Sequence, residues 1–136
     1  MLLNYDLCET AQYLGYKHGA KPSEEICELI EEAYKELCKV ITPKCIYKEY
    51  DFTRTEDGII IDGIEFISKK LLNHLRDSNS IILFGATIGV GADTLVRKYS
   101  VTDIAMTSVA HCVGASLVEN LCDKACEELK NTIEGE

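Results

Sequence analysis

Seven cysteines are the first residues in this chain that could do nucleophilic or redox chemistry. Their odd number, and an N-terminus without the basic flank and apolar run of a secretory signal, predict reduced thiols rather than a disulfide framework. None forms the two-residue-spaced pair of a structural zinc site; only Cys122 and Cys126 stand one helical turn apart, with no histidine nearby. We therefore predict no metal site and expect the cysteines to fill the core as small hydrophobic residues. The seven are Cys8, Cys27, Cys38, Cys45, Cys112, Cys122 and Cys126.

Two other pairs could suggest a reactive site. His111 and Cys112 are adjacent, but neighbouring helical positions point about 100° apart, so the two side chains cannot act as a base and its thiol nucleophile. A lone histidine in an apolar helix is more often a hydrogen-bonded core residue, and we expect His111 to be one. Glu119 and Asp123 lie one turn apart without a third ligand in reach, which favours a solvated face. No catalytic residue is predicted.

The segment from Phe84 to Asp93 has the pattern of a buried strand that enters a glycine-rich turn and then a helix. Backbone amides at such a helix start can hold an anion or a polar ligand group. The glycine spacing differs from a dinucleotide-binding fingerprint, and no lysine followed by serine or threonine is present, as a phosphate-binding loop requires. Composition alone favours a tight turn that needs small residues.

Two helices are expected in the first part of the chain. Between Pro22 and Thr42 apolar residues recur at helical spacing, Ser23 can cap the start, and Pro43 stops the end. A shorter helix is expected over residues 6–14, closed by Gly15.

A long helix is expected in the last part of the chain. Ser100 and Asp103 have the spacing of a capping pair, which places a helix from there to about Lys130. Residues 104–118 carry no charged side chain apart from one histidine, so this stretch must be buried almost all round. Charges return at Glu119, where the helix should emerge into solvent.

The middle of the chain has the pattern of an antiparallel meander. Residues 45–53, 59–61 and 64–67 have strand-forming composition, and they are separated by turns at Asp57-Gly58 and Asp62-Gly63.

A short helix over residues 68–75 and an uninterrupted apolar strand over residues 81–84 follow the meander. Such a strand is typical of the centre of a sheet. The sequence therefore predicts one α+β domain over residues 1–136, in which an antiparallel β-meander sheet packs against long helices.

Composition narrows the class of partner and the location. Fourteen basic and twenty-three acidic side chains give a net charge of −9, which disfavours binding to a nucleic-acid backbone. No stretch approaches the roughly 18 apolar residues of a membrane span. We expect a cytoplasmic protein that binds neither nucleic acid nor membrane.

Four segments, taken in chain order, match one known family: residues 13–17 (Tyr-Leu-Gly-Tyr-Lys), the Asp57-Gly58 to Asp62-Gly63 hairpin, residues 81–89, and the helix that begins at Thr102. Together they resemble the activation domain of cobalamin-dependent methionine synthase, particularly its free-standing bacterial form. The resemblance covers nearly the whole chain in the same order, and it corresponds to the N-terminal portion of that domain.

The resemblance implies a cofactor and a partner. In that family the domain binds S-adenosylmethionine (AdoMet) and closes over the corrin of a cobalamin methyltransferase whose cobalt has become oxidised. Methyl transfer coupled to one-electron reduction restores methylcobalamin; the corrin and the sulfonium supply the chemistry, and the protein supplies position and exclusion of water. The implied role is reactivation of a corrinoid-binding methyltransferase in methionine biosynthesis, and any enzymatic activity would be that of methionine synthase.

Candidate cofactor-binding residues follow from the same resemblance. Thr87, Gly89 and Glu119 match family positions, although their local pattern is structural. The family's main AdoMet-binding signature, an arginine followed four residues later by Gly-Tyr, is absent from this chain: the pair Gly15-Tyr16 has Ala11 where the arginine would be.

Two further hypotheses remain open. A non-catalytic scaffold that has lost AdoMet binding would pair with itself, because half of a fold exposes apolar surface that self-association covers. An independent thiol enzyme has only the number of cysteines in its favour.

Overall fold

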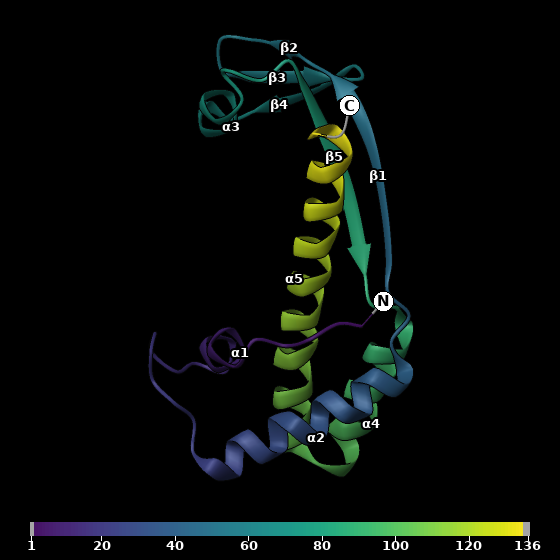
Figure 1. Cartoon of the computed structure of the whole chain (residues 1–136). Coiled ribbons are helices and arrows are strands. Elements are labelled where there is room, and N and C mark those ends of the chain that lie inside the picture. Colours follow the sequence, from purple (N-terminus) through teal and green to yellow (C-terminus); the bar gives the residue numbers. More distant parts are fainter. Residues whose placement is uncertain (1, 135–136) are drawn as a thin grey trace. The chain divides into compact units, whose positions relative to one another are not determined.

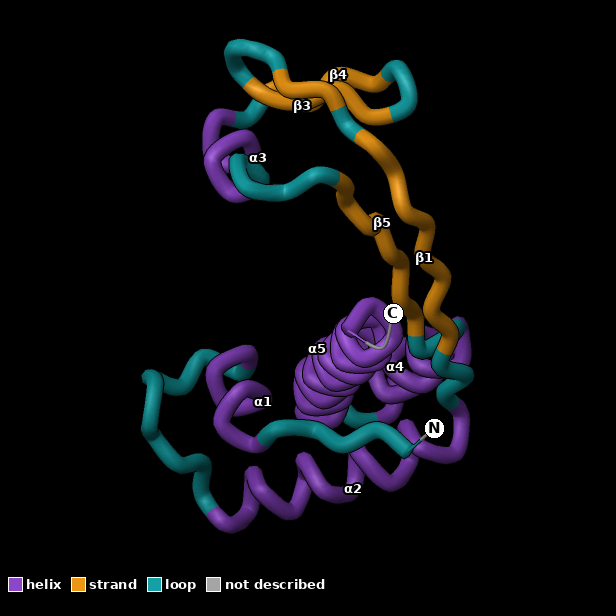
Figure 2. The backbone as a smooth tube through the Cα atoms, turned by 45° about the horizontal axis from the view of Figure 1, so that its top comes forward, coloured by secondary structure: helices purple, strands orange, loops and turns teal. Residues whose placement is uncertain are grey.

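The computed structural model describes residues 2–134, which form helices together with short antiparallel strands (Figure 1; Figure 2). This confirms the predicted α+β class. The elements in chain order are α1 (Leu7–Tyr13), α2 (Glu24–Val40), β1 (Lys44–Asp51), β2 (Thr53–Arg54), β3 (Gly58–Ile61), β4 (Ile64–Ile67), α3 (Lys69–His74), β5 (Ser80–Thr87), α4 (Val90–Thr102) and α5 (Ile104–Glu134).

The chain divides into two compact units. The helical unit comprises residues 1–45 and 86–136, and the sheet unit comprises residues 46–85. The chain crosses from one unit to the other within β1 and again within β5. The prediction of one domain over residues 1–136 stays a prediction.

The first two helices begin where the sequence predicts. Asp6 caps α1, because its Oδ1 accepts a hydrogen bond from the Glu9 amide at 2.8 Å. Ser23 caps α2 by accepting from the Ile26 amide at 3.3 Å, and α2 ends just before Pro43. Gly15 adopts φ 102°, so it closes α1 in a conformation that side chains rarely allow.

The long helix was predicted to begin at Ser100, but α5 begins at Ile104 and Ser100 belongs to the preceding helix, α4. Ser100 lies inside the last turns of α4, where its hydroxyl donates to the carbonyl of Arg97 at 2.6 Å. Asp103 alone separates α4 from α5: its backbone is extended, and its Oδ1 accepts from the Met106 amide at 3.2 Å. One residue therefore ends one helix and caps the next.

The core of the helical unit lies along the middle of α5. Val113, Leu117 and Leu121 are almost fully buried, and they belong to one apolar cluster with Ile30 and Leu37 of α2. The prediction that residues 104–118 are buried almost all round is wrong for the first turn of α5, because Ile104 is 80% exposed beside the chain reversal at residue 103. Between Val109 and Leu117 every residue except His111 and Ala115 is buried.

Length and apolar composition alone would allow α5 to cross a membrane, since an 18-residue stretch within Ile104–Ile133 has a mean hydropathy of 1.2. However, 44% of its most apolar stretch is buried inside the protein. This burial fits the core helix of a soluble protein.

The sheet unit contains the predicted antiparallel meander. Its three strands lie in the order β2-β3-β4, with Thr53 opposite Ile60 and Ile59 opposite Phe66. The β3–β4 turn has Asp62 and Gly63 at φ 50° and 79°, which is the left-handed geometry of a tight hairpin turn. A small core of Ile59, Ile61 and Leu75 lies between the meander and α3.

Two strand predictions were wrong in their pairing. Residues 45–53 do not join the meander as one strand; most of them form β1, which pairs with β5 in a separate two-stranded sheet. The apolar strand 81–84 lies in β5 and is not central or buried, since Leu83 and Phe84 are 45% and 40% exposed. An apolar run indicates a central strand only when other elements cover both faces of the sheet.

Arg54 holds the end of α3 in place. Its Nη2 atom donates to three carbonyl oxygens, those of Leu75, Arg76 and Ser78, at 2.7–3.1 Å. These contacts tie the turn that follows α3 to β2.

Candidate functional site: a pocket between α4 and α5

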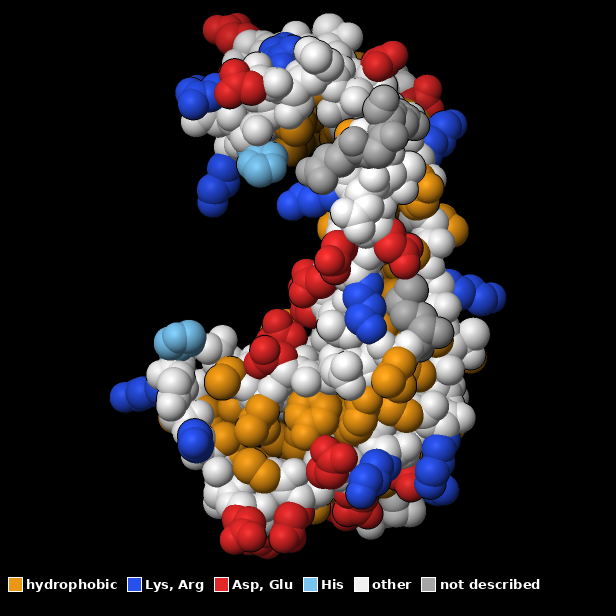
Figure 3. All heavy atoms as spheres, viewed as in Figure 1, with side chains coloured by type: hydrophobic (Ala, Val, Ile, Leu, Met, Phe, Trp, Pro, Cys, Tyr) orange, Lys and Arg blue, Asp and Glu red, His pale blue; other side chains and the backbone are white. Residues whose placement is uncertain are grey.

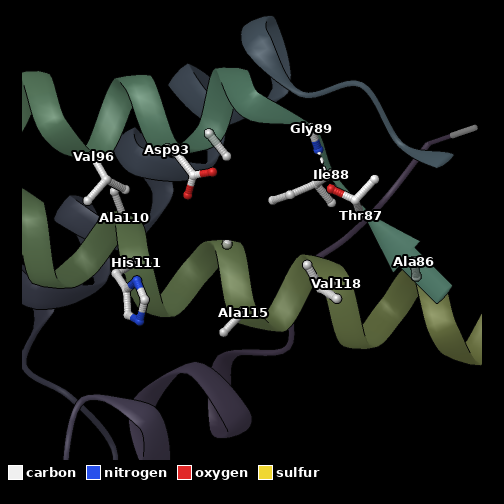
Figure 4. Close-up of a pocket in the computed structure, with 12 residues that line it drawn as sticks. Ala86, Thr87, Ile88, Gly89, Asp93, Val96, Ala110, His111, Ala115 and Val118 are labelled. Atoms are coloured by element: carbon white, nitrogen blue, oxygen red, sulfur yellow. Dashed lines mark hydrogen bonds between the residues drawn. The ribbon is translucent and has the colours of Figure 1, made fainter.

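A pocket of about 280 Å³ lies in the helical unit, between the turn that follows β5 and the facing sides of α4 and α5 (Figure 4). Most of the side chains around it are small or apolar. The lining residues are Ala86, Thr87, Ile88, Gly89, Ala92, Asp93, Val96, Ala110, His111, Gly114, Ala115 and Val118.

Close backbone packing explains the glycines at one end of the pocket. Gly89 adopts φ 92°, and a Cβ atom there would lie 3.2 Å from Thr42. A Cβ atom at Gly91 would lie 2.1 Å from the carbonyl oxygen of Val40, so the start of α4 packs directly on the end of α2. The Thr42 amide donates to the Ile88 carbonyl at 2.6 Å and fixes this junction. The geometry agrees with the tight-turn interpretation of this segment.

The turn leaves part of the helix start uncapped. Thr87 Oγ1 accepts from the Gly89 amide at 3.0 Å, which is the hydrogen bond drawn in Figure 4. Gly89 itself offers no side-chain acceptor to the first turn of α4. Amides at that turn are therefore left to water or to a bound polar group.

One acidic and one imidazole side chain line the pocket. Asp93 extends from α4 toward α5 in Figure 4, and His111 lies on α5. None of the lining residues in the described chain is Lys or Arg. Acidic side chains also follow the second half of α5 in Figure 3, where Glu119, Asp123 and Glu127 are exposed. The surroundings of the pocket therefore favour a neutral or cationic ligand.

The expectation that His111 is a hydrogen-bonded core residue is wrong. His111 is exposed, and its ring makes no hydrogen bond within residues 2–134. The buried face of α5 is provided by neighbours such as Ala110 and Val113, while position 111 lies at the pocket.

The three predicted cofactor-binding residues do not lie in one pocket. Thr87 and Gly89 both line the pocket between α4 and α5. Glu119 lines a separate, more polar pocket of about 220 Å³ beside the N-terminal segment. There the Asp6 amide donates to Ser116 Oγ at 2.8 Å, and the Asn4 amide donates to Asn120 Oδ1 at 3.0 Å. These two hydrogen bonds hold the N-terminal segment against α5.

The cysteines do not form a reactive centre. All seven thiols are free, and Cys112 is the one that is buried. Burial raises the pKa of the Cys112 thiol, which keeps it protonated and weakly nucleophilic. The core-filling prediction is confirmed for Cys112 and wrong for the exposed Cys8, Cys38 and Cys126.

No group of three or more His, Cys, Asp or Glu side chains within residues 2–134 is placed to hold a metal ion.

Sequence reasoning missed Asp93 and His111 as pocket residues. Their spacing held a signal, because Gly89, Asp93 and Val96 recur at helical intervals on α4, and so do the lining residues of α5 between 110 and 118. Two such stripes indicate the facing sides of two packed helices. The sequence did not show that α4 ends and α5 begins at Asp103, so the pairing of the two stripes could not be predicted.

Comparison with known proteins adds no relative. No protein-family model matches the chain, and no curated protein matches it in sequence.

Proposed function

We propose that this chain is a cytoplasmic domain of the methionine synthase activation type, which binds AdoMet and serves the reductive reactivation of a corrinoid-binding methyltransferase. The ordered resemblance along the sequence suggests this role. The observation that carries the proposal is the pocket between α4 and α5, because it brings together Thr87 and Gly89, two of the three residues that match the family.

The chemistry of the pocket suits part of AdoMet. AdoMet carries a positive sulfonium and a positive ammonium group beside one carboxylate. Asp93 offers a negative charge to the cationic groups, and the uncapped amides at the start of α4 offer donors to the carboxylate. A volume of about 280 Å³ lies just below the range of roughly 300–1,000 Å³ that is usual for ligand pockets. This pocket would therefore enclose only one end of the molecule.

The proposal places AdoMet on residues other than those of the family signature. The Arg-x-x-x-Gly-Tyr pattern is absent from the sequence. The residues of this chain would bind and orient the donor, whereas cobalamin, carried by the partner, would supply the redox chemistry.

Calorimetric titration with AdoMet tests the proposal. S-adenosylhomocysteine lacks the transferable methyl group and the sulfonium charge. It should therefore bind more weakly than AdoMet if the Asp93 carboxylate attracts that charge. Asp93→Asn should reduce AdoMet affinity by up to about fivefold, as expected for an exposed ion pair, and should narrow the difference between the two ligands. Glu128→Gln is the matched control, because Glu128 is exposed near the end of α5 and lines neither pocket. A chain that binds neither ligand would refute the assignment.

The partner is tested separately by capture of a purified corrinoid methyltransferase on the immobilised chain. Retention that increases when AdoMet is present is the expected result. Equal retention with and without AdoMet would show that the cofactor does not link the two proteins.

The second candidate function is a self-associating scaffold that binds no cofactor. It is favoured by the exposed apolar side chains of the two-stranded sheet, where Ile46 and Tyr47 of β1 are 77% and 62% exposed beside Leu83 and Phe84 of β5. Analytical ultracentrifugation of the full chain decides between the two. A strict monomer that binds AdoMet would exclude the scaffold.

A further inference from the structure

A second pocket of the helical unit adjoins the first. It has a volume of about 390 Å³ and shares Val96 and His111 with the pocket between α4 and α5. Two side chains therefore form the junction between the two hollows. The second pocket is lined by Tyr13, Leu14, Val96, Thr107, Ser108, His111 and Cys112.

The two pockets follow one another along α5. The lining residues on this helix run from Thr107 in the second pocket to Val118 in the first. Eleven residues at the helical rise span about 16 Å. A molecule that filled both pockets would have to be elongated, with one part on each side of His111.

The two ends differ in their chemistry. The first pocket contains the one carboxylate of the lining, Asp93, and the second contains the one aromatic side chain other than His111, Tyr13. Tyr13 is 47% exposed, so the ring is open to a ligand. Neither set of described lining residues includes Lys or Arg.

The surroundings of Tyr13 are negatively charged as well. Burial raises the pKa of Tyr13, and the Glu9 and Glu119 carboxylates raise it further. The phenol is therefore a neutral surface in a negative environment, which attracts a cation and repels an anion.

We infer that the two pockets form one groove for a single elongated ligand, with a cationic group beside Asp93 and a flat ring against Tyr13. The inference rests on the proposed function where the ligand is AdoMet, whose adenine would then lie at Tyr13 and whose sulfonium at Asp93. The class of ligand is wider, since any cation joined to a flat ring satisfies the same contacts.

The test uses two small probes that share a ring and differ in charge. (6-Phenylhexyl)trimethylammonium ion and 6-phenylhexanesulfonate, in which a six-carbon chain separates the ring from the charge, are titrated into the isotope-labelled full chain, and backbone amide shifts are followed by nuclear magnetic resonance. The cation should shift the amides of both Asp93 and Tyr13 along one common saturation curve, and the sulfonate should shift neither. Shifts on only one side of His111, or equal binding of the anion, would overturn the inference.

Two variants measure how much Tyr13 and Asp93 each contribute to binding of the cation. Tyr13→Ala should weaken binding of the cation about fivefold through lost aromatic contact, and Asp93→Asn should weaken it by a similar factor through lost charge. Glu128→Gln, an exposed position near the end of α5 that lines neither pocket, serves as the control and should leave the titration within about twofold of the original chain. An undiminished affinity in both Tyr13→Ala and Asp93→Asn would contradict the groove.

Parallel titration with AdoMet separates the two claims. Binding of (6-phenylhexyl)trimethylammonium at both ends without binding of AdoMet would retain the groove and reject the proposed function. Binding of AdoMet that is insensitive to Tyr13→Ala would retain the proposed function and reject the single groove.

Discussion

Gly91 and Gly114 are helical glycines at which the same substitution should have opposite effects on stability. A Cβ atom at Gly91 would lie 2.1 Å from the Val40 carbonyl oxygen, so α4 would have to move about an ångström away from α2. At Gly114 the nearest atom is Ile88 Cδ1 at 3.7 Å, an ordinary contact. Each change adds one methyl group and helix propensity, and only the space around it differs.

The magnitudes follow from these distances. Gly114→Ala should raise the free energy of unfolding by roughly 0.5–1 kcal/mol, because alanine is the better helix former. Gly91→Ala should lower it by about 1–3 kcal/mol, since overpacking against a backbone atom outweighs the gain in propensity. The two variants should therefore differ in melting temperature on the order of 10 °C.

Thermal unfolding followed by circular dichroism at a helical wavelength measures both variants against the original chain. Urea unfolding supplies the free energies and shows whether the slope with denaturant is unchanged. A Gly91→Ala chain as stable as the original would show that α4 does not approach α2 so closely. A destabilised Gly114→Ala chain would show that the space beside Ile88 is filled.

Three other perturbations test separate parts of the structure. Gly58→Ala should remove hydrogen-exchange protection from the β3–β4 hairpin, because the new Cβ would lie 1.9 Å from the Phe66 carbonyl oxygen; retained protection would contradict this contact. Burial, and then the hydrogen bond to Glu31, raise the pKa of Tyr5 to about 12. The folded state thus holds this proton more tightly than the unfolded chain, so its stabilisation is complete below pH 10.0 and is lost as pH rises toward about 12. Tyr5→Phe should reduce that alkaline loss in urea unfolding, and an identical loss in both chains would count against it. Arg54→Ala should destabilise the sheet unit by about 1–2 kcal/mol in urea unfolding, because it removes the Nη2 donor to three carbonyl groups; an unchanged midpoint would be the contrary result.

Capping residues made the helices of the first part predictable. Asp6 and Ser23 act within three residues of themselves, so their effect is visible in the sequence. The same local logic misplaced the start of α5, because Ser100 and Asp103 have capping-pair spacing although only Asp103 acts as a cap. The sequence does not tell which of the two side chains caps α5, because that depends on where the preceding helix, α4, ends.

Long-range pairing limited the prediction of strands. The meander was predictable because its turns at residues 57–58 and 62–63 are local. The partner of β5 lies far away in the sequence, and neither its two-stranded pairing nor the exposure of Leu83 follows from an apolar run.

The candidate site shows the same limit. Thr87 and Gly89 are close in sequence and stay together, whereas Glu119, the residue after Val118, lies on another side of α5 and lines another pocket. His111 was expected in the core because its neighbours are apolar. The average character of a helix segment does not determine which way one side chain points.

The extended backbone of Asp103 also has a consequence for how the pocket walls assemble. Because α4 and α5 are joined through this one residue, the contacts between their facing sides have short sequence separation, and the loop that must close to form them is small. Such a helical hairpin can form early in folding, before the distant α2 docks on it. Loss of the Asp103 carboxylate would remove the cap of α5 and weaken this hairpin by about 1 kcal/mol.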